Sequence, residues 1–280
     1  EAENSEALGF GFRCGFLGLL HMDVIRERLE REYNLSLILS APSVKYEITL
    51  TDGGIVDIES PTKMPERSQV SEIREPVVSA TIITTETFLG KMIELVNERR
   101  GTIVNVDYLD DINGVKRVKI SSVIPLSEII TDFFDKLKSL SSGYASLDYE
   151  LTGMQPVDAI KLDILIAGTM IDALARIVPK EHAERLGREL VERLKEVVPR
   201  QSFEVPIQAT IGGSNGVAGK IIARTDVKAF RKDVIGGLSG GDRSRKDKLL
   251  DKQKEGKKRM KQVGKVELPQ EAFLAVLKQD

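Results

Sequence analysis

The alternation of apolar and polar positions is clearest between residues 74 and 153. Val78, Ala80 and Ile82 occupy every second position, which predicts a strand with one buried face. Apolar residues three or four positions apart predict helices, and Gly101 stands where the first of these should end. The predicted elements are strands at 78–82, 104–108, 118–120 and 145–151 and helices at 88–96 and 126–140. This β-α-β-β-α-β order is that of the ferredoxin-like split unit, in which both helices cover one sheet face and leave the other free.

The preceding residues predict only half of a compact α/β unit. A Gly- and Phe-rich stretch leads into a helix that ends near Tyr33, and strands are expected at 35–39 and 44–50. Residues 51–73 contain Asp52-Gly53-Gly54 and two prolines, so we expect a turn and linker region there. We therefore expect 1–50 to be the second half of a ferredoxin-like domain.

Residues 154–280 predict a further α+β domain. Strands are expected at 157–166 and 169–178, a helix at 183–197, and a hairpin of strands 203–211 and 217–224 around a Gly-rich loop with an Asn-Gly pair. A short final helix is expected to start near Leu268-Pro269. The fold class expected for the whole chain is thus α+β, with a ferredoxin-like domain at 74–153 and an α+β carboxyl-terminal domain that ends in a basic helical tail.

Charge is unevenly distributed along the chain. The 280 residues carry a formal net charge of −2, but residues 217–265 contain 16 basic and 6 acidic residues. Such asymmetry indicates a polyanionic partner, although a solvated Lys-rich tail explains it as well. Apolar residues are so few at 242–262 that burial cannot hold a helix there in isolation. Because no aromatic residues lie among the cations at 243–265, we expect contacts to RNA phosphates, with affinity that falls with salt, rather than reading of bases.

Enzyme chemistry finds little support in the sequence. The spacing of Gly9, Gly11 and Gly15 misses the dinucleotide motif, and Gly219-Lys220 is followed by Ile221, so the phosphate-binding P-loop motif is absent. We expect Cys14 to be a buried thiol and His21 to lie at a helix start. A cluster of acidic residues near one turn permits a metal, although turn chemistry explains it better; its members are Asp107, Asp110 and Asp111.

Targeting signals are also not evident. No apolar run approaches the roughly 18–20 residues that a membrane span needs, and the acidic residues 1–6 do not resemble a signal peptide. One cysteine cannot form an internal disulfide, which fits a reducing compartment. With two histidines besides, a zinc site of the usual kind is not expected.

Three segments resemble the elongation factor 4 (LepA) family of translational GTPases. Residues 7–22 (ALGFGFRCGFLGLLHM) resemble the family's third domain. Residues 75–145 are similar to its domain V, which elongation factor G shares. Residues 240–262 (GGDRSRKDKLLDKQKEGKKRMKQ) and 267–273 (ELPQEAF) resemble its own carboxyl-terminal domain.

The resemblance implies a domain plan. Residues 1–50 would be the second half of domain III, 51–73 a linker, 74–153 domain V, and 154–280 the carboxyl-terminal domain with the basic tail at 242–265. The chain would then start inside domain III, and we interpret it as a fragment that lacks the GTPase domain. GTP and Mg²⁺ would belong to that domain, and no cofactor is expected in this chain.

The resemblance also implies a function. It implies a ribosome-binding protein that contacts 23S rRNA, large-subunit proteins and A-site or P-site tRNA near the peptidyl transferase centre. The roles implied are back-translocation and translational fidelity, or support of ribosome assembly or initiation. No DNA partner is implied, and a monomer is expected. The implied location is the cytoplasm, with peripheral association at the inner face of the cell membrane.

Candidate RNA-binding residues follow from the basic clusters. Arg99 and Arg100 would touch rRNA, although cations at a helix end also complement the helix dipole. The other candidates are Arg224, Lys228, Arg231, Lys232, Arg243, Arg245, Lys246, Lys248, Lys252, Lys254, Lys257, Lys258, Arg259, Lys261 and Lys265. Two alternatives stay open: an RNA-binding or ribosome-assembly module that works without a GTPase, and an enzyme with a site around Cys14, His21 or His182.

Overall fold

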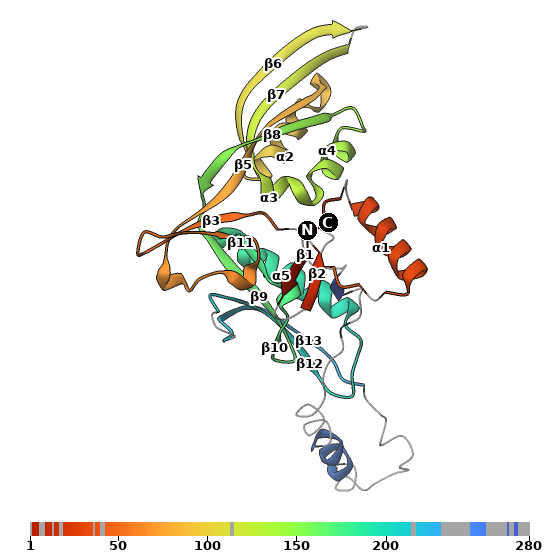
Figure 1. Cartoon of the computed structure of the whole chain (residues 1–280). Coiled ribbons are helices and arrows are strands. Elements are labelled where there is room, and N and C mark those ends of the chain that lie inside the picture. Colours follow the sequence, from red (N-terminus) through yellow and green to blue (C-terminus); the bar gives the residue numbers. More distant parts are fainter. Residues whose placement is uncertain are drawn as a thin grey trace. The chain divides into compact units, whose positions relative to one another are not determined.

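The computed structural model describes two compact units, each of which is treated by itself (Figure 1). The ferredoxin-like unit contains residues 42–160 and 176–180, and the second unit contains 1–41, 161–175 and 181–276. Within these ranges, the described residues are 2–5, 9–12, 14–16, 19–35, 37–39, 43–112, 115–213, 217–230, 247–255, 268 and 272–273.

The ferredoxin-like unit has the predicted β-α-β-β-α-β order. Its elements are β5 (Val70–Thr85), α2 (Leu89–Glu98), β6 (Thr102–Ile112), β7 (Val115–Pro125), the helical segment 126–140 and β8 (Ser146–Pro156). The antiparallel order β8-β5-β7-β6 places the first strand in the middle of the sheet. Val78, Ala80 and Ile82 are fully buried and pack in one core with side chains of both helices, which confirms the predicted fold class.

The second helix of this unit is interrupted by a π-turn. It consists of α3 (Leu126–Glu128), the π-helical η4 (Ile129–Phe133) and α4 (Phe134–Leu140). The extra residue in the turn re-aims the side chains, so Ile129, Phe133 and Leu137 all enter the core. The chain leaves α4 through Ser142 and Gly143, both with positive φ, as is common where helices end.

The segment 51–73, expected to be a turn and linker region, instead contains strand and 3-10 structure. β3 (Tyr46–Leu50) and β4 (Ile55–Ile58) form a hairpin whose turn is Asp52-Gly53-Gly54. β3 also pairs with the start of β5, and two short 3-10 turns, Pro61–Lys63 and Arg67–Gln69, complete the segment. The turn residues at 52–54 thus belong to a hairpin rather than to a linker. Ile48 and Ile58 on its two strands are buried in a second core, which stabilises it. β11 (Arg176–Pro179) adds Ile177 to the same core.

The amino-terminal part of the second unit differs from the expectation in two places. It contains the hairpin of β1 (Ala2–Ser5) and β2 (Gly9–Phe12), followed by α1 (Leu19–Tyr33). The strand expected at 35–39 is not formed by residues 35 and 37–39, which have no regular structure. Cys14 was expected to be buried but is exposed, because the apolar residues beside it are themselves exposed, as Phe12 and Phe16 show.

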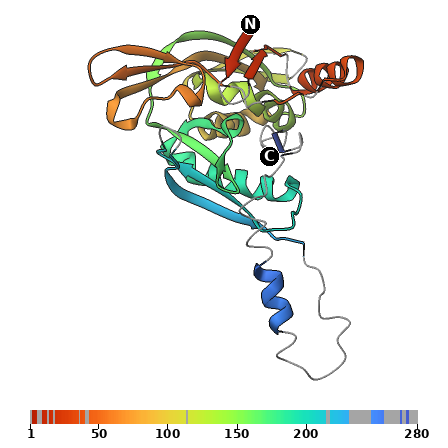
Figure 2. The same cartoon turned by 60° about the horizontal axis from the view of Figure 1, so that its bottom comes forward.

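The rest of the second unit is an antiparallel sheet covered by one helix. β9 (Ala159–Ile166), β10 (Thr169–Met170), β12 (Val205–Ile211) and β13 (Lys220–Val227) form the order β10-β9-β12-β13. The strand expected at 169–178 is instead β10, a 3-10 turn (Asp172–Leu174) and β11. α5 (Lys180–Val197) lies along one face of the sheet (Figures 1 and 2). Gly187 allows this close approach, since a Cβ there would lie 2.8 Å from Cδ1 of Ile222.

Little of the basic tail lies within the described residues. Residues 247–255 are helical, and Ala272 and Phe273 are helical and buried. The other parts of the tail and the short helix expected near residue 268 lie mostly outside the described residues. No helix in the described part of the chain is both long and apolar enough to cross a membrane.

Candidate nucleic-acid interface

Arg100 is held in an ion-pair cluster inside the ferredoxin-like unit. It follows α2 in a left-handed conformation (φ 56°), which turns its side chain back across the domain. Its Nη1 and Nη2 donate to the two carboxylate oxygens of Glu75 at 2.6 and 3.0 Å, and its Nε donates to Glu128 at 2.8 Å. The Glu75 side chain is only 1% exposed and that of Arg100 14%. Such a bidentate pair fixes both partners strongly.

The same cluster gathers polar groups from several elements. Ser127 lies within hydrogen-bond distance of both Arg100 and Glu75, and Gln155 of β8 donates to Glu75 at 3.3 Å. Tyr46 of β3 is also buried nearby. Burial raises the pKa of its phenol well above the ordinary value, and the charge of Glu75 adds to this effect. The cluster therefore ties the β3–β4 hairpin, β5, β8 and both helices together.

Arg99 extends this cluster to the π-turn. Its Nη2 donates to Oδ1 of Asp132 at 2.6 Å, and its Nη1 lies 3.6 Å from Glu128. Lys136 approaches the other oxygen of Asp132 at 3.4 Å. The Arg99 side chain is 11% exposed. Both arginines expected at the RNA surface thus have their guanidinium groups engaged by carboxylates of their own domain.

Arg224 and Lys228 lie in the second unit, near the end of the sheet. Arg224 stands on β13 opposite Gln208 and pairs with Asp226 at 3.0 Å, with about half of its side chain exposed. Lys228 follows the strand and is exposed. Both side chains are open to solvent, and a phosphate that approached Arg224 would compete with Asp226.

Three of the tail cations are described, and all three are exposed. Lys248, Lys252 and Lys254 lie on the helical residues 247–255, where Leu249 and Leu250 are only partly buried. The remaining candidates lie outside the described residues: Arg231, Lys232, Arg243, Arg245, Lys246, Lys257, Lys258, Arg259, Lys261 and Lys265.

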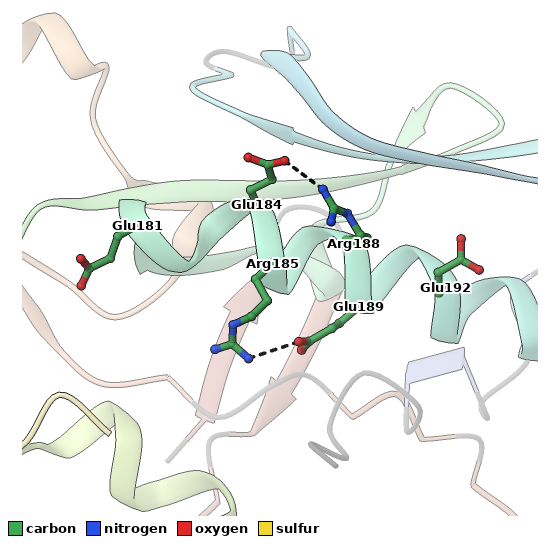
Figure 3. Close-up of a pocket in the computed structure, with 6 residues that line it drawn as sticks. All are labelled: Glu181, Glu184, Arg185, Arg188, Glu189 and Glu192. Carbon is green, nitrogen blue, oxygen red and sulfur yellow. Dashed lines mark hydrogen bonds and ion pairs between the residues drawn. The ribbon is translucent and has the colours of Figure 1, made fainter. Parts of the chain in front are cut away.

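A hollow on α5 is lined by four glutamates and two arginines, so its net charge is negative. Figure 3 shows the six side chains that line it, with Glu184 bonded to Arg188 and Arg185 bonded to Glu189. The lining residues are Glu181, Glu184, Arg185, Arg188, Glu189 and Glu192. Since each arginine is paired with an acidic residue one helical turn away, this surface does not present a site for phosphate.

A buried carboxylate in the second unit was not predicted. Asp163 of β9 is 0% exposed, and its Oδ1 lies 3.0 Å from Nζ of Lys161. Burial raises the pKa of Asp163, and Lys161 only partly opposes this effect. Its cross-strand neighbour Thr210 is also buried. Lys161 and Asp163 alternate with apolar residues in β9, so the pattern alone predicts a solvent-facing carboxylate and gives no sign that Asp163 is buried.

The structure shows different neighbours for Cys14, His21 and His182, the residues of the enzyme alternative. His21 lies in the first turn of α1, as expected, and its ring meets that of Phe16. Cys14 donates weakly to the carbonyl of Phe12, and His182 is paired with Glu181. Within the described ranges, no three metal-ligating side chains come together. Asp107 accepts a hydrogen bond from Asn105 on β6, whereas the side chains of Asp110 and Asp111 lie outside the description.

Comparison with known proteins assigns this arrangement to a class. The family described as "Elongation factor G C-terminus" matches residues 72–165, and "GTP-binding protein LepA C-terminus" matches 166–278. Residues 72–278 are therefore similar to the carboxyl-terminal regions of translation elongation factors. The two matches meet between residues 165 and 166, within β9, and the domain boundary expected at 153 stays a prediction.

Individual relatives give the particular family. The chain is 57% identical to elongation factor 4 1 of Lactiplantibacillus plantarum over 280 residues, and 57% identical to elongation factor 4 of Levilactobacillus brevis. It is 56% identical to elongation factor 4 of Clostridium botulinum over 278 residues. These matches cover 99–100% of the chain and 44% of each relative. The chain belongs to the elongation factor 4 family and spans less than half of the length of these relatives.

Proposed function

We propose that this chain is the ribosome-binding part of a translation factor of the elongation factor 4 type. The observation that supports the proposal is the excess of cations at residues 217–265 in a chain whose net charge is −2. RNA phosphates attract such a segment because each neutralised phosphate releases bound counterions. The family names of the relatives favour ribosomal RNA and tRNA as the source of these phosphates.

The basic groups divide into two roles in this proposal. The tail cations, with Lys248, Lys252 and Lys254 exposed on a helix, hold phosphates. Arg99 and Arg100 act from inside their domain, because their guanidinium groups already bind carboxylates. They keep the ferredoxin-like unit rigid while the tail makes the contacts.

GTP and Mg²⁺ do not fit the residues of this chain. Gly219-Lys220 is the nearest approach to a P-loop, but the backbone of Gly219 is packed against β12, where an added Cβ would collide with the carbonyl of Ile211. The residue after the lysine is Ile221 rather than Ser or Thr. GTP hydrolysis is therefore proposed for the part of the relatives that lies outside the matched region.

The proposed setting is the large ribosomal subunit. There the chain contacts rRNA and a tRNA acceptor arm near the peptidyl transferase centre, and so promotes back-translocation and translational fidelity. It acts as a monomer in the cytoplasm, with peripheral association at the cell membrane. Each of these points is taken from the family and depends on ribosome binding.

Sedimentation with 50S subunits tests this function. Reversing Lys248, Lys252 and Lys254 to Glu should strongly reduce the amount of protein that pellets at low salt. The matched control reverses Arg185, Arg188 and Lys195, which are also three exposed cations on one helix. The control should pellet like the wild type, because its cations are paired within α5.

Other outcomes contradict parts of the proposal. If the tail variant pelleted as well as the control, the tail would not be the binding element. Binding to free structured RNA as tight as to ribosomes would favour the GTPase-independent RNA-binding or assembly module. GTP hydrolysis by the purified chain would show that the division of roles is wrong.

A further inference from the structure

Two aromatic rings are stacked at one end of the ferredoxin-like unit. Phe88 ends the 3-10 turn before α2, and Tyr144 follows the turn after α4. Their ring centroids are 6.2 Å apart and their planes differ by 19°. Tyr144 is 70% exposed. An aromatic ring that is held nearly parallel to a second ring, yet remains mostly open to solvent, offers a flat surface for a further planar group.

The surroundings of this pair are polar and uncrowded. Nζ of Lys91 lies 5.8 Å from the centroid of Phe88. At Gly90 and Gly143, an added Cβ would meet nothing within 4 Å, so both glycines border open space. Other exposed neighbours in the sequence are Glu86, Thr87 and Ser142. The pair is therefore an aromatic surface with a cation beside it, and its exposed neighbours in the sequence are small, polar or charged.

We propose that Tyr144, supported by Phe88, stacks on an unpaired RNA base. This inference rests on the proposed function and adds a base contact to the phosphate contacts of the tail. Unstacked bases in single-stranded loops are recognised by aromatic side chains, and a neighbouring cation can neutralise the flanking phosphate. Lys91 supplies this cation.

The same features argue against a protein partner. Hot spots between proteins are aromatic anchors that fill fully desolvated pockets, with packed contacts around them that exclude water. At this site the exposed neighbours in the sequence are small, polar or charged, whereas the apolar neighbours Leu89 and Ala145 are partly or fully buried in the core. A single flat base with its phosphate fits a surface of that size, and a protein interface would need a larger apolar area.

Fluorescence of 2-aminopurine tests the inference. The probes are an RNA hairpin with one unpaired 2-aminopurine in its loop and a fully paired duplex that carries the same base. Tyr144→Ala should weaken binding of the hairpin by roughly 5- to 140-fold, the equivalent of one lost stacking contact, and should abolish quenching of the base. Binding of the duplex should be unchanged.

Two further variants serve as controls. Tyr144→Phe retains a ring of the same shape and should restore both affinity and quenching. Tyr108→Ala removes another exposed tyrosine of the same unit, 64% exposed on β6, and should change neither. Folding of each variant is checked by circular dichroism.

The outcomes separate this inference from the proposed function. Equal loss for hairpin and duplex, or no loss with Tyr144→Ala, would overturn the stacking contact. The tail-reversed variant, in contrast, should bind both RNAs more weakly and with a smaller salt dependence, whatever happens at Tyr144. If the wild type bound neither RNA nor ribosomes, both proposals would be wrong.

Discussion

Replacing Arg100 with methionine tests whether the buried ion-pair cluster holds the ferredoxin-like unit together. The substitution keeps a long apolar side chain but removes the groups that bind Glu75 and Glu128. Glu75 is 1% exposed, so its carboxylate would keep little access to water. It would retain only the weaker partners Ser127 and Gln155.

The expected cost follows from this burial. Removing one partner of a buried ion pair costs about 3–5 kcal/mol, because the remaining charge is left uncompensated. The Arg100 side chain is 14% exposed, so water can reach the position of its guanidinium group in the variant. We therefore expect a loss near the lower end, about 3 kcal/mol. Arg185→Met is the control: its pair with Glu189 is largely exposed, and such pairs contribute only about 0–1 kcal/mol.

Urea unfolding followed by circular dichroism measures the loss. Because the chain has two compact units, one transition cannot be assumed to describe both. Hydrogen exchange therefore assigns the change, and amides of β5, β7 and β8 should lose protection in Arg100→Met. Amides of β9 and β12 should not change.

RNA binding gives the second readout for the same variant. If Arg100 acts only within its domain, the folded variant should retain the salt dependence of wild-type RNA binding. A variant as stable as Arg185→Met would refute the structural role. A reduced salt slope in a variant that is still folded would restore Arg100 as a phosphate contact.

Three further substitutions have expected outcomes. Gly101→Ala should destabilise the ferredoxin-like unit by about 1–3 kcal/mol, since its Cβ would lie 2.9 Å from the carbonyl of Val96. Gly90→Ala, whose added Cβ would meet nothing within 4 Å on α2, should stabilise it by about 0.5–1 kcal/mol in the same urea unfolding assay; equal effects would contradict the packing argument. Burial raises the pKa of Asp163, so its contribution to stability is complete below an unfolded pKa of about 3.9 and is lost as pH rises through the folded value. Asp163→Asn should reduce the pH dependence of the unfolding free energy between the unfolded and the folded pKa of Asp163. An unaltered pH dependence would refute the raised pKa.

The ferredoxin-like fold could be predicted because its signals are local. Val78, Ala80 and Ile82 face one core, and their alternation is visible within five residues of sequence. The β3–β4 hairpin could not be recognised with equal ease. Its strands have five and four residues, and they are held by pairing with β5, which the local pattern does not show.

The candidate site was less predictable because charge alone does not reveal its partner. Arg99 and Arg100 are two consecutive cations at a helix end. In the sequence, this pair fits a contact with RNA as well as it fits ion pairs within the domain. Their carboxylate partners Glu75, Glu128 and Asp132 are 25–33 residues away in sequence and are brought together only by the folded sheet and the π-turn. In the tail, the scarcity of apolar residues predicts that the cations are exposed. Lys248, Lys252 and Lys254 are exposed, and their contact with RNA stays a prediction.

The salt dependence of binding to 50S subunits tests the central claim most directly. The logarithm of the association constant should fall linearly with the logarithm of the salt concentration, by roughly 0.7–0.9 for each phosphate contact. Replacing Lys248, Lys252 and Lys254 with Gln should therefore reduce the slope by about 2–3. An unchanged slope in this variant, or wild-type binding that does not respond to salt, would contradict the account.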